Sequence, residues 1–327
     1  MKSQLIDPFG RKIEYLRLSV TDKCNMRCFY CLPKGYNDFD NASQHLTQDE
    51  MVRIVGAFAD LGVHRVRLTG GEPLVRKDIC ELSARLSRLP GLEDLSLSTN
   101  ASLLKDKAAQ LKQVGITRIN VSLDTLRPER HREINGGRLS DAIDGLMAAK
   151  AAGFHPIKIN MVAMKGINDD EFEDMVAFCI KHDFTLRFIE TMPISVAGRK
   201  GSEHYLDLHD VETHLQQNFE LIPGVMPSGG PARYVKVSGA NLRIGFITPI
   251  SQHFCETCNR VRLTSSGTLF LCLGHEHKIE LRELLRNGLS DEGLKQCLID
   301  ALILKPERHH FTEKPSQIVR FMANIGG

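Results

Sequence analysis

The sequence lacks a strong excess of either charge and lacks the common nucleotide-binding loops. Its 42 Lys and Arg residues against 40 Asp and Glu residues leave a formal net charge of only +2. This balance does not indicate a nucleic-acid partner, and an anion site would need a local cluster of basic side chains. No Gly-x4-Gly-Lys-Ser/Thr or Gly-x-Gly-x-x-Gly sequence is present. A bound nucleotide would therefore not be held by a standard phosphate loop.

The sequence also lacks the features of an exported or membrane-bound protein. No apolar stretch approaches the roughly 18 to 20 residues that span a bilayer, and residues 1–11 are too polar for a signal peptide. The nine cysteines are an odd number, and three of them fall within eight residues. This pattern favours metal binding in a reducing compartment over disulfide formation. We therefore expect a cytoplasmic protein that does not contact a membrane.

The three clustered cysteines are Cys24, Cys28 and Cys31, spaced as Cys-x3-Cys-x2-Cys. The spacing brings three thiolates within reach of one metal centre, and no nearby Cys or His supplies a fourth ligand. Zinc ribbons usually present Cys-x2-Cys pairs that complete a tetrahedron. A 4Fe-4S cluster held by three cysteines would instead leave one iron open to an external ligand. An unusual zinc site is the alternative.

Alternating strand and helix patterns predict the fold. Thr47 and Glu50 form a capping box before a helical apolar pattern that stops at Gly62. Six β/α units are too few for a full (β/α)8 barrel, so we expect an α/β fold with a partial (β/α)6 TIM-like barrel, open on one side. The six strands are predicted at 15–18, 65–69, 94–98, 119–122, 157–162 and 185–190.

Barrel enzymes carry their chemistry in the loops that follow the strands. Every such loop in this sequence holds polar or conformationally special residues. The loops contain, in order, the first three cysteines, Gly70-Gly71-Glu72-Pro73, Thr99-Asn100, Asp124, Lys165-Gly166 and Thr191-Met192-Pro193.

A length of 327 residues suggests two domains. We place a partial-barrel domain at 1–220 and a smaller carboxyl-terminal domain at 221–327, linked through the irregular region 195–231. Further strands are expected at 234–237 and 242–247.

The carboxyl-terminal domain contains a second triplet, Cys255, Cys258 and Cys272. A predicted hairpin that turns at Ser265-Ser266-Gly267 would bring Cys272 back beside Cys258. On spacing alone, structural zinc with His275 or His277 as the fourth ligand competes evenly with a cluster. The other cysteines, Cys80, Cys179 and Cys297, fall on apolar helical faces and are expected to be small buried side chains.

Basic residues interrupt several predicted strands. Arg17, Arg67 and Lys158 lie on strands of the barrel, whose lumen is a costly place for a charge without an anion. Arg260 and Arg262 alternate at strand period and so face one side. A solvated strand face is the ordinary alternative for such a pair.

The segment Cys24-Asn25-Met26-Arg27-Cys28-Phe29-Tyr30-Cys31 resembles the signature of the radical S-adenosylmethionine (SAM) enzymes. Gly70-Gly71-Glu72-Pro73 resembles the motif with which these enzymes bind the amino group of SAM. With the second cysteine triplet and the final Gly326-Gly327, the chain resembles the GTP 3′,8-cyclase family over essentially its whole length.

This resemblance implies two 4Fe-4S clusters and SAM as cofactors. Cys24, Cys28 and Cys31 would hold the cluster that chelates SAM, and the second triplet would hold a cluster whose open iron binds the guanine of GTP. A 5′-deoxyadenosyl radical would abstract hydrogen from C3′ of GTP, and the sugar radical would attack C8. The product would be (8S)-3′,8-cyclo-7,8-dihydroguanosine 5′-triphosphate, in the first step of molybdenum cofactor biosynthesis. The enzyme would be a radical SAM lyase.

The resemblance also implies roles for individual residues. Ser98-Thr99-Asn100-Ala101 departs from the Thr-Thr-Asn-Gly that is more frequent in the family, but Ser98 keeps the hydroxyl. The implied SAM contacts are Tyr30, Gly71, Glu72, Ser122 and Met192. The implied GTP contacts are Arg17, Arg67, Ser98, Lys158, Arg260, Val261 and Arg262. The implied catalytic residues are Arg17 and the tail glycines Gly326 and Gly327, which would thread between the clusters.

The expected partners follow from the same family. They are GTP as substrate, an electron donor such as flavodoxin or ferredoxin, and a downstream cyclic pyranopterin monophosphate synthase, with the enzyme itself a monomer or homodimer. One alternative is a radical SAM enzyme with auxiliary clusters that modifies a peptide, although such proteins usually carry more cysteines in the carboxyl-terminal part. The other is a non-catalytic zinc or electron-transfer protein.

Overall fold

The structure is a computed structural model that describes residues 4–226, 230–311, 313 and 315–326. The strands in these residues are β1 (Tyr15–Ser19), β2 (Arg65–Thr69), β3 (Asp94–Thr99), β4 (Arg118–Ser122), β5 (Ile157–Val162), β6 (Thr185–Ile189), β7 (Leu221–Gly224), β8 (Arg233–Val237), β9 (Arg243–Ile247), β10 (Arg260–Leu263), β11 (Thr268–Phe270) and β12 (Lys278–Glu280).

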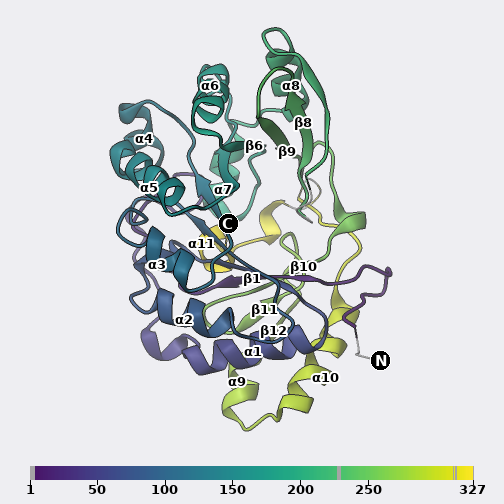
Figure 1. Cartoon of the computed structure of the whole chain (residues 1–327). Coiled ribbons are helices and arrows are strands. Elements are labelled where there is room, and N and C mark those ends of the chain that lie inside the picture. The colour runs from purple at the N-terminus through teal and green to yellow at the C-terminus, as the bar shows by residue number, and fades with distance from the viewer. Residues whose placement is uncertain (1–3, 227–229, 312, 314, 327) are drawn as a thin grey trace.

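Helices connect most of these strands (Figure 1). The α-helices are α1 (Gln48–Asp60), α2 (Ile79–Leu86), α3 (Ala108–Gln113), α4 (Pro128–Asn135), α5 (Leu139–Ala151), α6 (Phe172–His182), α7 (Ser195–Ser202), α8 (Leu208–Gln216), α9 (Leu281–Arg286), α10 (Asp291–Ala301) and α11 (Met322–Ile325). The short 3-10 helices are η1 (Ala42–Gln44), η2 (Pro73–Val75), η3 (Cys255–Thr257), η4 (Leu302–Leu304) and η5 (Pro315–Gln317).

The described strands form one sheet in the order β12-β11-β10-β1-β2-β3-β4-β5-β6-β9-β8-β7. Strands β1 to β6 are parallel and follow chain order, which confirms the predicted α/β fold. Two further strands extend the parallel part, because β10 pairs with β1 and β9 pairs with β6. These two pairings were not predicted. The sheet ends at β12 and β7, so it remains open as expected.

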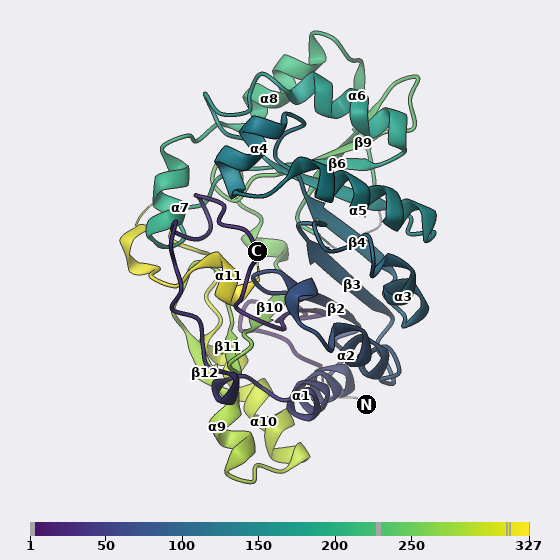
Figure 2. The ribbon, with the colours of Figure 1, turned by 90° about the vertical axis from the view of Figure 1, so that its left-hand side faces the viewer.

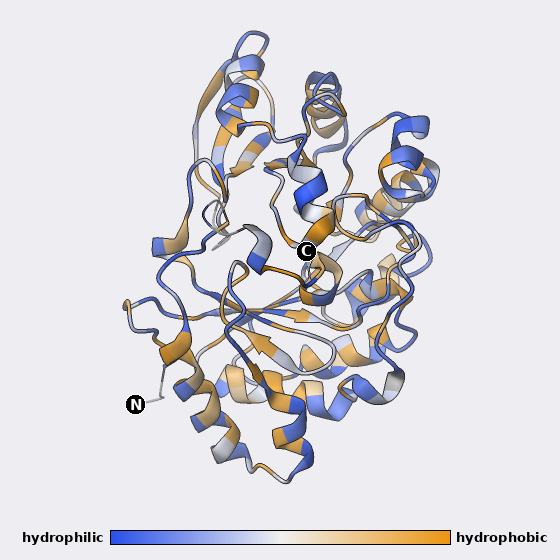
Figure 3. Ribbon diagram, turned by 180° about the vertical axis from the view of Figure 1, so that it is seen from behind, coloured by the Kyte–Doolittle hydropathy of each residue, from blue (hydrophilic) through white to orange (hydrophobic). Residues whose placement is uncertain are grey.

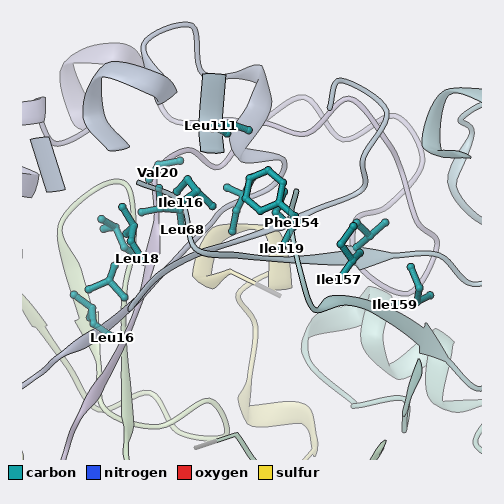
Figure 4. Close-up of a cluster of buried hydrophobic side chains, with 14 of the residues drawn as sticks. Leu16, Leu18, Val20, Leu68, Leu111, Ile116, Ile119, Phe154, Ile157 and Ile159 are labelled. Atoms are coloured by element: carbon teal, nitrogen blue, oxygen red, sulfur yellow. The ribbon is translucent and has the colours of Figure 1, made fainter. Parts of the chain in front are cut away.

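Strand alternation separates an apolar outer face from a polar inner face. Leu16 and Leu18 of β1 are fully buried on the helix side, whereas Arg17 between them points into the lumen. Figure 4 shows this core, where leucines and isoleucines of β1, β2, β4 and β5 meet Leu111 of α3 and Phe154. Figure 2 shows α2, α3 and α5 along β2 to β4, with α11 on the opposite side. The same pattern thus builds the core and places charge in the lumen.

Helix α1 confirms the capping prediction. The Thr47 side chain accepts a hydrogen bond from the Glu50 backbone at 3.1 Å, and the Glu50 carboxylate accepts one from the Thr47 backbone at 2.7 Å. The helix ends where Gly62 adopts φ +94°, a conformation that favours glycine. Figure 3 shows hydrophilic and hydrophobic residues mixed along the outer helices, and no helix in the described residues is both long and apolar enough to cross a membrane.

The carboxyl-terminal part of the chain completes both edges of the sheet. Strands β7 to β9 lie beyond β6, and β10 to β12 lie beyond β1. The region 195–231, expected to be irregular, contains α7, α8 and β7. The division at 220 and 221 therefore stays a prediction about domains, while the sheet itself is continuous.

Candidate active site between two cysteine triplets

The first cysteine loop follows β1 at the carboxyl end of the sheet. The backbone N–H groups of Cys31 and Leu32 both donate to the carbonyl of Cys28, at 2.8 and 3.0 Å, which forms a tight turn. Burial raises the pKa of Cys24 to about 11 and that of Cys31 to about 12. These thiols would stay protonated at neutral pH unless a metal centre stabilised their thiolates. The donor set therefore fits an iron-sulfur cluster.

The Gly70-Gly71-Glu72 turn packs directly against this loop. The Gly71 N–H donates to the Thr21 carbonyl at 2.9 Å, and the Glu72 N–H donates to the Lys23 carbonyl at 2.8 Å. A Cβ atom on either glycine would overlap these backbone atoms, so the two turns can approach this closely only because both residues are glycine. The expected motif is thus held beside Cys24.

Two buried carboxylates flank the first triplet. Glu72 accepts hydrogen bonds from Thr99 Oγ1 and from the Asn100 backbone, both at 2.7 Å, and burial raises its pKa to about 7. Tyr30 donates to Asp124 at 2.6 Å, and burial raises the pKa of Asp124 to about 6. Glu72 and Tyr30, both predicted SAM contacts, are thus fixed by neighbouring loops.

The other two predicted SAM contacts, Met192 and Ser122, lie in other parts of the chain. Met192 lines the cavity that the second cysteine triplet also lines. Ser122 is an exposed residue at the end of β4, in register with Asn160 of β5. Met192 follows the end of β6, as the loop argument predicted, whereas Ser122 is the last residue of β4.

The second triplet surrounds the start of β10 and the end of β11. These strands form the predicted hairpin, with Arg262 opposite Phe270 and Leu263 opposite Leu269. All three cysteines line the same cavity. Burial raises the pKa values of Cys255 and Cys272, whereas that of Cys258 is lowered despite burial, chiefly by the Lys305 and Arg260 charges. Each sulfur also accepts a backbone hydrogen bond, from His309, Arg260 and Gly274 for Cys255, Cys258 and Cys272 respectively. Such N–H donors to sulfur are a usual part of iron-sulfur sites.

The two histidines considered as a fourth zinc ligand each contact a backbone carbonyl. His275 Nε2 contacts the Arg308 carbonyl at 2.9 Å, and His277 Nδ1 contacts the Leu304 carbonyl at 2.9 Å. These contacts use one ring nitrogen of each imidazole and do not distinguish zinc from a cluster.

The sulfurs of neither triplet are gathered closely. Within the described residues, the only three Cys, His, Asp or Glu ligand atoms that lie within 4.8 Å of one another belong to Asp22, Asp40 and His45. Three cysteine thiols without a fourth protein ligand from the described residues remain the donor set of each triplet.

The cavity that the second triplet lines is strongly basic. Arg17 lies in register with Arg67 on one side and with Arg262 on the other, and Lys158 lies on β5 across the sheet. No Asp or Glu lines the cavity among the described residues. The six basic residues that line it are Arg17, Arg67, Lys158, Arg187, Arg260 and Arg262.

Burial and crowding lower the pKa values of Lys158, Arg17 and Arg187 in this cavity. Burial, helped by Arg187, Arg118 and Arg67, lowers the pKa of Lys158 to about 7. Burial likewise lowers the pKa of Arg17 and of Arg187 to about 10. A set of buried cations without carboxylates is stable only if an anion joins it. The predicted contacts Arg17, Arg67, Ser98, Lys158, Arg260, Val261 and Arg262 all line this cavity.

Sequence reasoning missed several residues of the cavity. Arg187 lies between the buried Leu186 and Phe188 on β6 and donates to Asn160 Oδ1 at 2.8 Å. Its sequence signal was the same as for Arg17 and Lys158: a charge between apolar neighbours on a barrel strand. His309 was also missed, and both of its ring nitrogens are buried without a hydrogen-bond partner in the described residues.

The carboxyl-terminal tail lies between the two triplets. Arg262 donates to the carbonyls of Ile325, at 3.2 Å, and Gly326. A hydrogen bond from the Ala323 backbone lowers the pKa of Cys31, which burial otherwise raises. A Cβ atom at Gly326 would overlap the Thr69 hydroxyl. Gly327, the other predicted tail residue, lies outside the described residues.

Comparisons with known proteins agree with this geometry. The family model described as the Radical SAM superfamily matches residues 18–179, and that described as Molybdenum Cofactor Synthesis C matches residues 184–311. The chain is 47% identical to GTP 3′,8-cyclase of Hydrogenovibrio crunogenus and 46% identical to GTP 3′,8-cyclase 2 of Pseudomonas aeruginosa, covering 99% of both chains in each case. The crystal structure of Streptococcus suis SuiB bound to S-adenosylmethionine has a similar fold, with a TM-score of 0.60 at 18% identity over 92% of this chain and 74% of that chain.

Proposed function

This chain belongs to the GTP 3′,8-cyclase family of radical SAM enzymes, and we propose from this premise how its residues divide the reaction. The enzyme converts GTP to (8S)-3′,8-cyclo-7,8-dihydroguanosine 5′-triphosphate in the first step of molybdenum cofactor biosynthesis. The observation that carries the proposal is the cavity that six basic side chains line together with the second cysteine triplet. A triphosphate supplies the anion that these cations lack.

The first triplet would hold the 4Fe-4S cluster and SAM. When bound, this pair supplies a carbon radical through one-electron cleavage of SAM. The task of the chain is placement, because the reacting carbon of GTP must lie next to that radical with water excluded. Glu72 and Tyr30 carry out part of this task, since their hydrogen bonds to Asn100 and Asp124 fix the walls of the SAM pocket.

The second triplet would hold another 4Fe-4S cluster, whose open iron orients the guanine base. The backbone hydrogen bonds to all three sulfurs support this assignment. Arg260 is the clearest phosphate contact. Its guanidinium lies between the Tyr15 and Phe254 rings, at 5.7 and 5.8 Å from their centroids, and its Nε has no partner in the described residues.

The tail would complete the pocket rather than the fold. Gly326 lies where any side chain would overlap Thr69, and its carbonyl binds Arg262. The tail thereby orients Arg262 toward the substrate, which fits the catalytic roles predicted for Arg17, Gly326 and Gly327. The remaining expectations are also part of this proposal: a cytoplasmic monomer or homodimer that receives electrons from flavodoxin or ferredoxin and supplies a cyclic pyranopterin monophosphate synthase.

Anaerobic reconstitution with iron and sulfide tests the proposal. The reduced protein is mixed with SAM, with and without GTP, and 5′-deoxyadenosine and the cyclised nucleotide are quantified. The proposal predicts that 5′-deoxyadenosine forms mainly when GTP is present and matches the nucleotide product in amount. Equal yields with and without GTP would contradict it.

A further inference from the structure

Lys305 is a buried lysine beneath the second cysteine triplet. It follows η4 and is 2% exposed. Its Nζ donates to the carbonyl of Leu271 at 2.5 Å and to that of Arg260 at 3.2 Å, and it lies 3.8 Å from Cys258 Sγ. No carboxylate oxygen of the described residues lies within 4.0 Å of this ammonium group. The charge therefore lacks an acidic partner in the protein chain.

A buried ammonium without an anion is unfavourable, because carbonyl groups satisfy its donors but carry no net charge. The third donor of Lys305 is directed at a cysteine sulfur. A thiolate-ligated cluster at this site carries net negative charge and would provide the missing anion.

The surrounding contacts hold Lys305 in this position. Arg11, paired with Asp7 at 2.5 Å, donates to the carbonyls of Pro306 at 2.6 Å and Glu307 at 2.5 Å. The same Arg11 donates to the Cys255 carbonyl at 2.8 Å. One buried arginine thus ties the segment after Lys305 to the loop that carries the first cysteine of the triplet.

We propose that Lys305 is the counter-ion of the second cluster. It keeps the reduction potential of that cluster more positive than an uncharged residue at the same position would. Lys305 contacts the cysteine ligand and the backbone of both strands that carry the site, so it acts as a positioning residue. A fixed cation beside an iron-sulfur cluster stabilises the reduced form, which has one more negative charge. This inference rests on the proposed second cluster.

The test isolates the second cluster in a Cys24/Cys28/Cys31→Ser variant, in which the first site cannot assemble. Lys305→Met removes the charge while keeping an unbranched side chain, and Lys305→Arg keeps the charge. Lys278→Met is the matched control, because Lys278 pairs with Glu280 at 3.0 Å on the neighbouring β12 and is half exposed. Iron and acid-labile sulfide are measured after anaerobic reconstitution. The midpoint potential follows from a potentiometric titration monitored by electron paramagnetic resonance.

The expected result is a full second cluster in every variant, with a more negative midpoint potential only in Lys305→Met. Lys305→Arg should remain closer to the parent, and Lys278→Met should match the parent. A second outcome would also support a requirement for the charge. In that outcome Lys305→Met alone loses the cluster while its circular dichroism stays normal, and Lys305→Arg keeps a full cluster. An unchanged potential in Lys305→Met would overturn the inference about Lys305. Absence of iron from the parent background would instead overturn the proposed second cluster.

Discussion

The two cysteine triplets have the same kind of ligand but differ in the charges next to one of their thiols. Around the first, burial raises the thiol pKa values, and the acidic neighbours Glu72 and Asp124 raise those of Cys24 and Cys28 further. Around the second, burial also raises the pKa of Cys255 and Cys272, but the pKa of Cys258 is lowered despite burial, because Lys305, Arg260 and Arg11 favour its thiolate. Identical ligand sets can thus be given different tasks by the charges placed next to them.

The same contrast extends to what each triplet faces. The first lies against glycine and carboxylate loops that suit the amino acid end of SAM. The second lies beside β10, whose Arg260 and Arg262 point into the basic lumen. In the proposed assignment, the first site takes the cofactor and the second faces the polyanionic substrate.

Removing the cysteines of each site should separate these tasks most strongly. Replacing Cys24, Cys28 and Cys31 by Ala should abolish SAM cleavage, because no cluster remains to reduce SAM. Replacing Cys255, Cys258 and Cys272 should leave one cluster and some 5′-deoxyadenosine but no cyclised nucleotide. Iron content and product analysis provide the measurement. Zinc in place of iron at the second site of anaerobically purified protein would contradict the assignment of a cluster to Cys255, Cys258 and Cys272.

Blocking the tail should have the next largest effect. Gly326→Val should abolish the cyclised product, because the new side chain would collide with Thr69. Cluster content and melting temperature should change little, since the tail contributes to the pocket more than to the core. Residues appended after Gly327 should act in the same way, and an amino-terminal extension of equal length is the control. Full activity in a carboxyl-terminally tagged protein would refute this role.

Single substitutions of lumen arginines should have intermediate effects. Arg260→Ala and Arg187→Ala should each weaken GTP binding by about ten- to a hundredfold, from the loss of a charge-assisted contact of about 1.5 to 3 kcal/mol. Guanosine binding should change far less, since it has no phosphates. Arg243→Ala, an exposed arginine on β9, is the matched control. Anaerobic equilibrium dialysis measures both ligands, and equal weakening of GTP and guanosine would point to a folding defect.

The smallest predicted effect concerns the protonation of Lys158 in the lumen. Burial lowers the pKa of Lys158 to about 7 in the free protein, so Lys158 loses its proton as the pH rises through this value. A bound triphosphate should raise this pKa again, and GTP binding at about pH 8.5 should take up as much as about one proton. Affinity should accordingly fall as the pH rises above about 7.

Calorimetry in buffers of different ionisation enthalpy measures that proton uptake. Lys158→Met should remove it and flatten the pH dependence of affinity. The same uptake in Lys158→Met as in the parent would assign the proton to another group.

The sequence pattern was sufficient to predict β1 to β6, the cysteine loops and most of the lumen cations. These features are local, since strand alternation and loop position can be read without knowing which strands are neighbours. The pairing of β10 with β1 could not be read in this way, because Arg260-Val261-Arg262 shows a strand but not its partner. Arg262 was accordingly assigned only to phosphate, whereas the structure also gives it the tail carbonyls.

The burial of Lys305 could not be predicted from the sequence either. Lys305 follows Leu302-Ile303-Leu304 at a helix end, where lysine is commonly a solvent-exposed residue. Its burial depends on β10 and β11, which lie more than thirty residues earlier in the chain. Long-range contacts of this kind leave no periodic signal in the sequence.

The pairing of β1 with both β2 and β10 has a consequence for biosynthesis. During translation β1 and β2 emerge early, whereas β10 emerges only after residues 260–263 have been made. Until then β1 is an edge strand with unpaired backbone groups, and the cysteine loop at its end lacks one wall. Contacts so distant in sequence form slowly, and open strand edges favour association with other chains. The sheet around β1 is therefore completed late in synthesis, and until then the open edge of β1 is available for association with other chains.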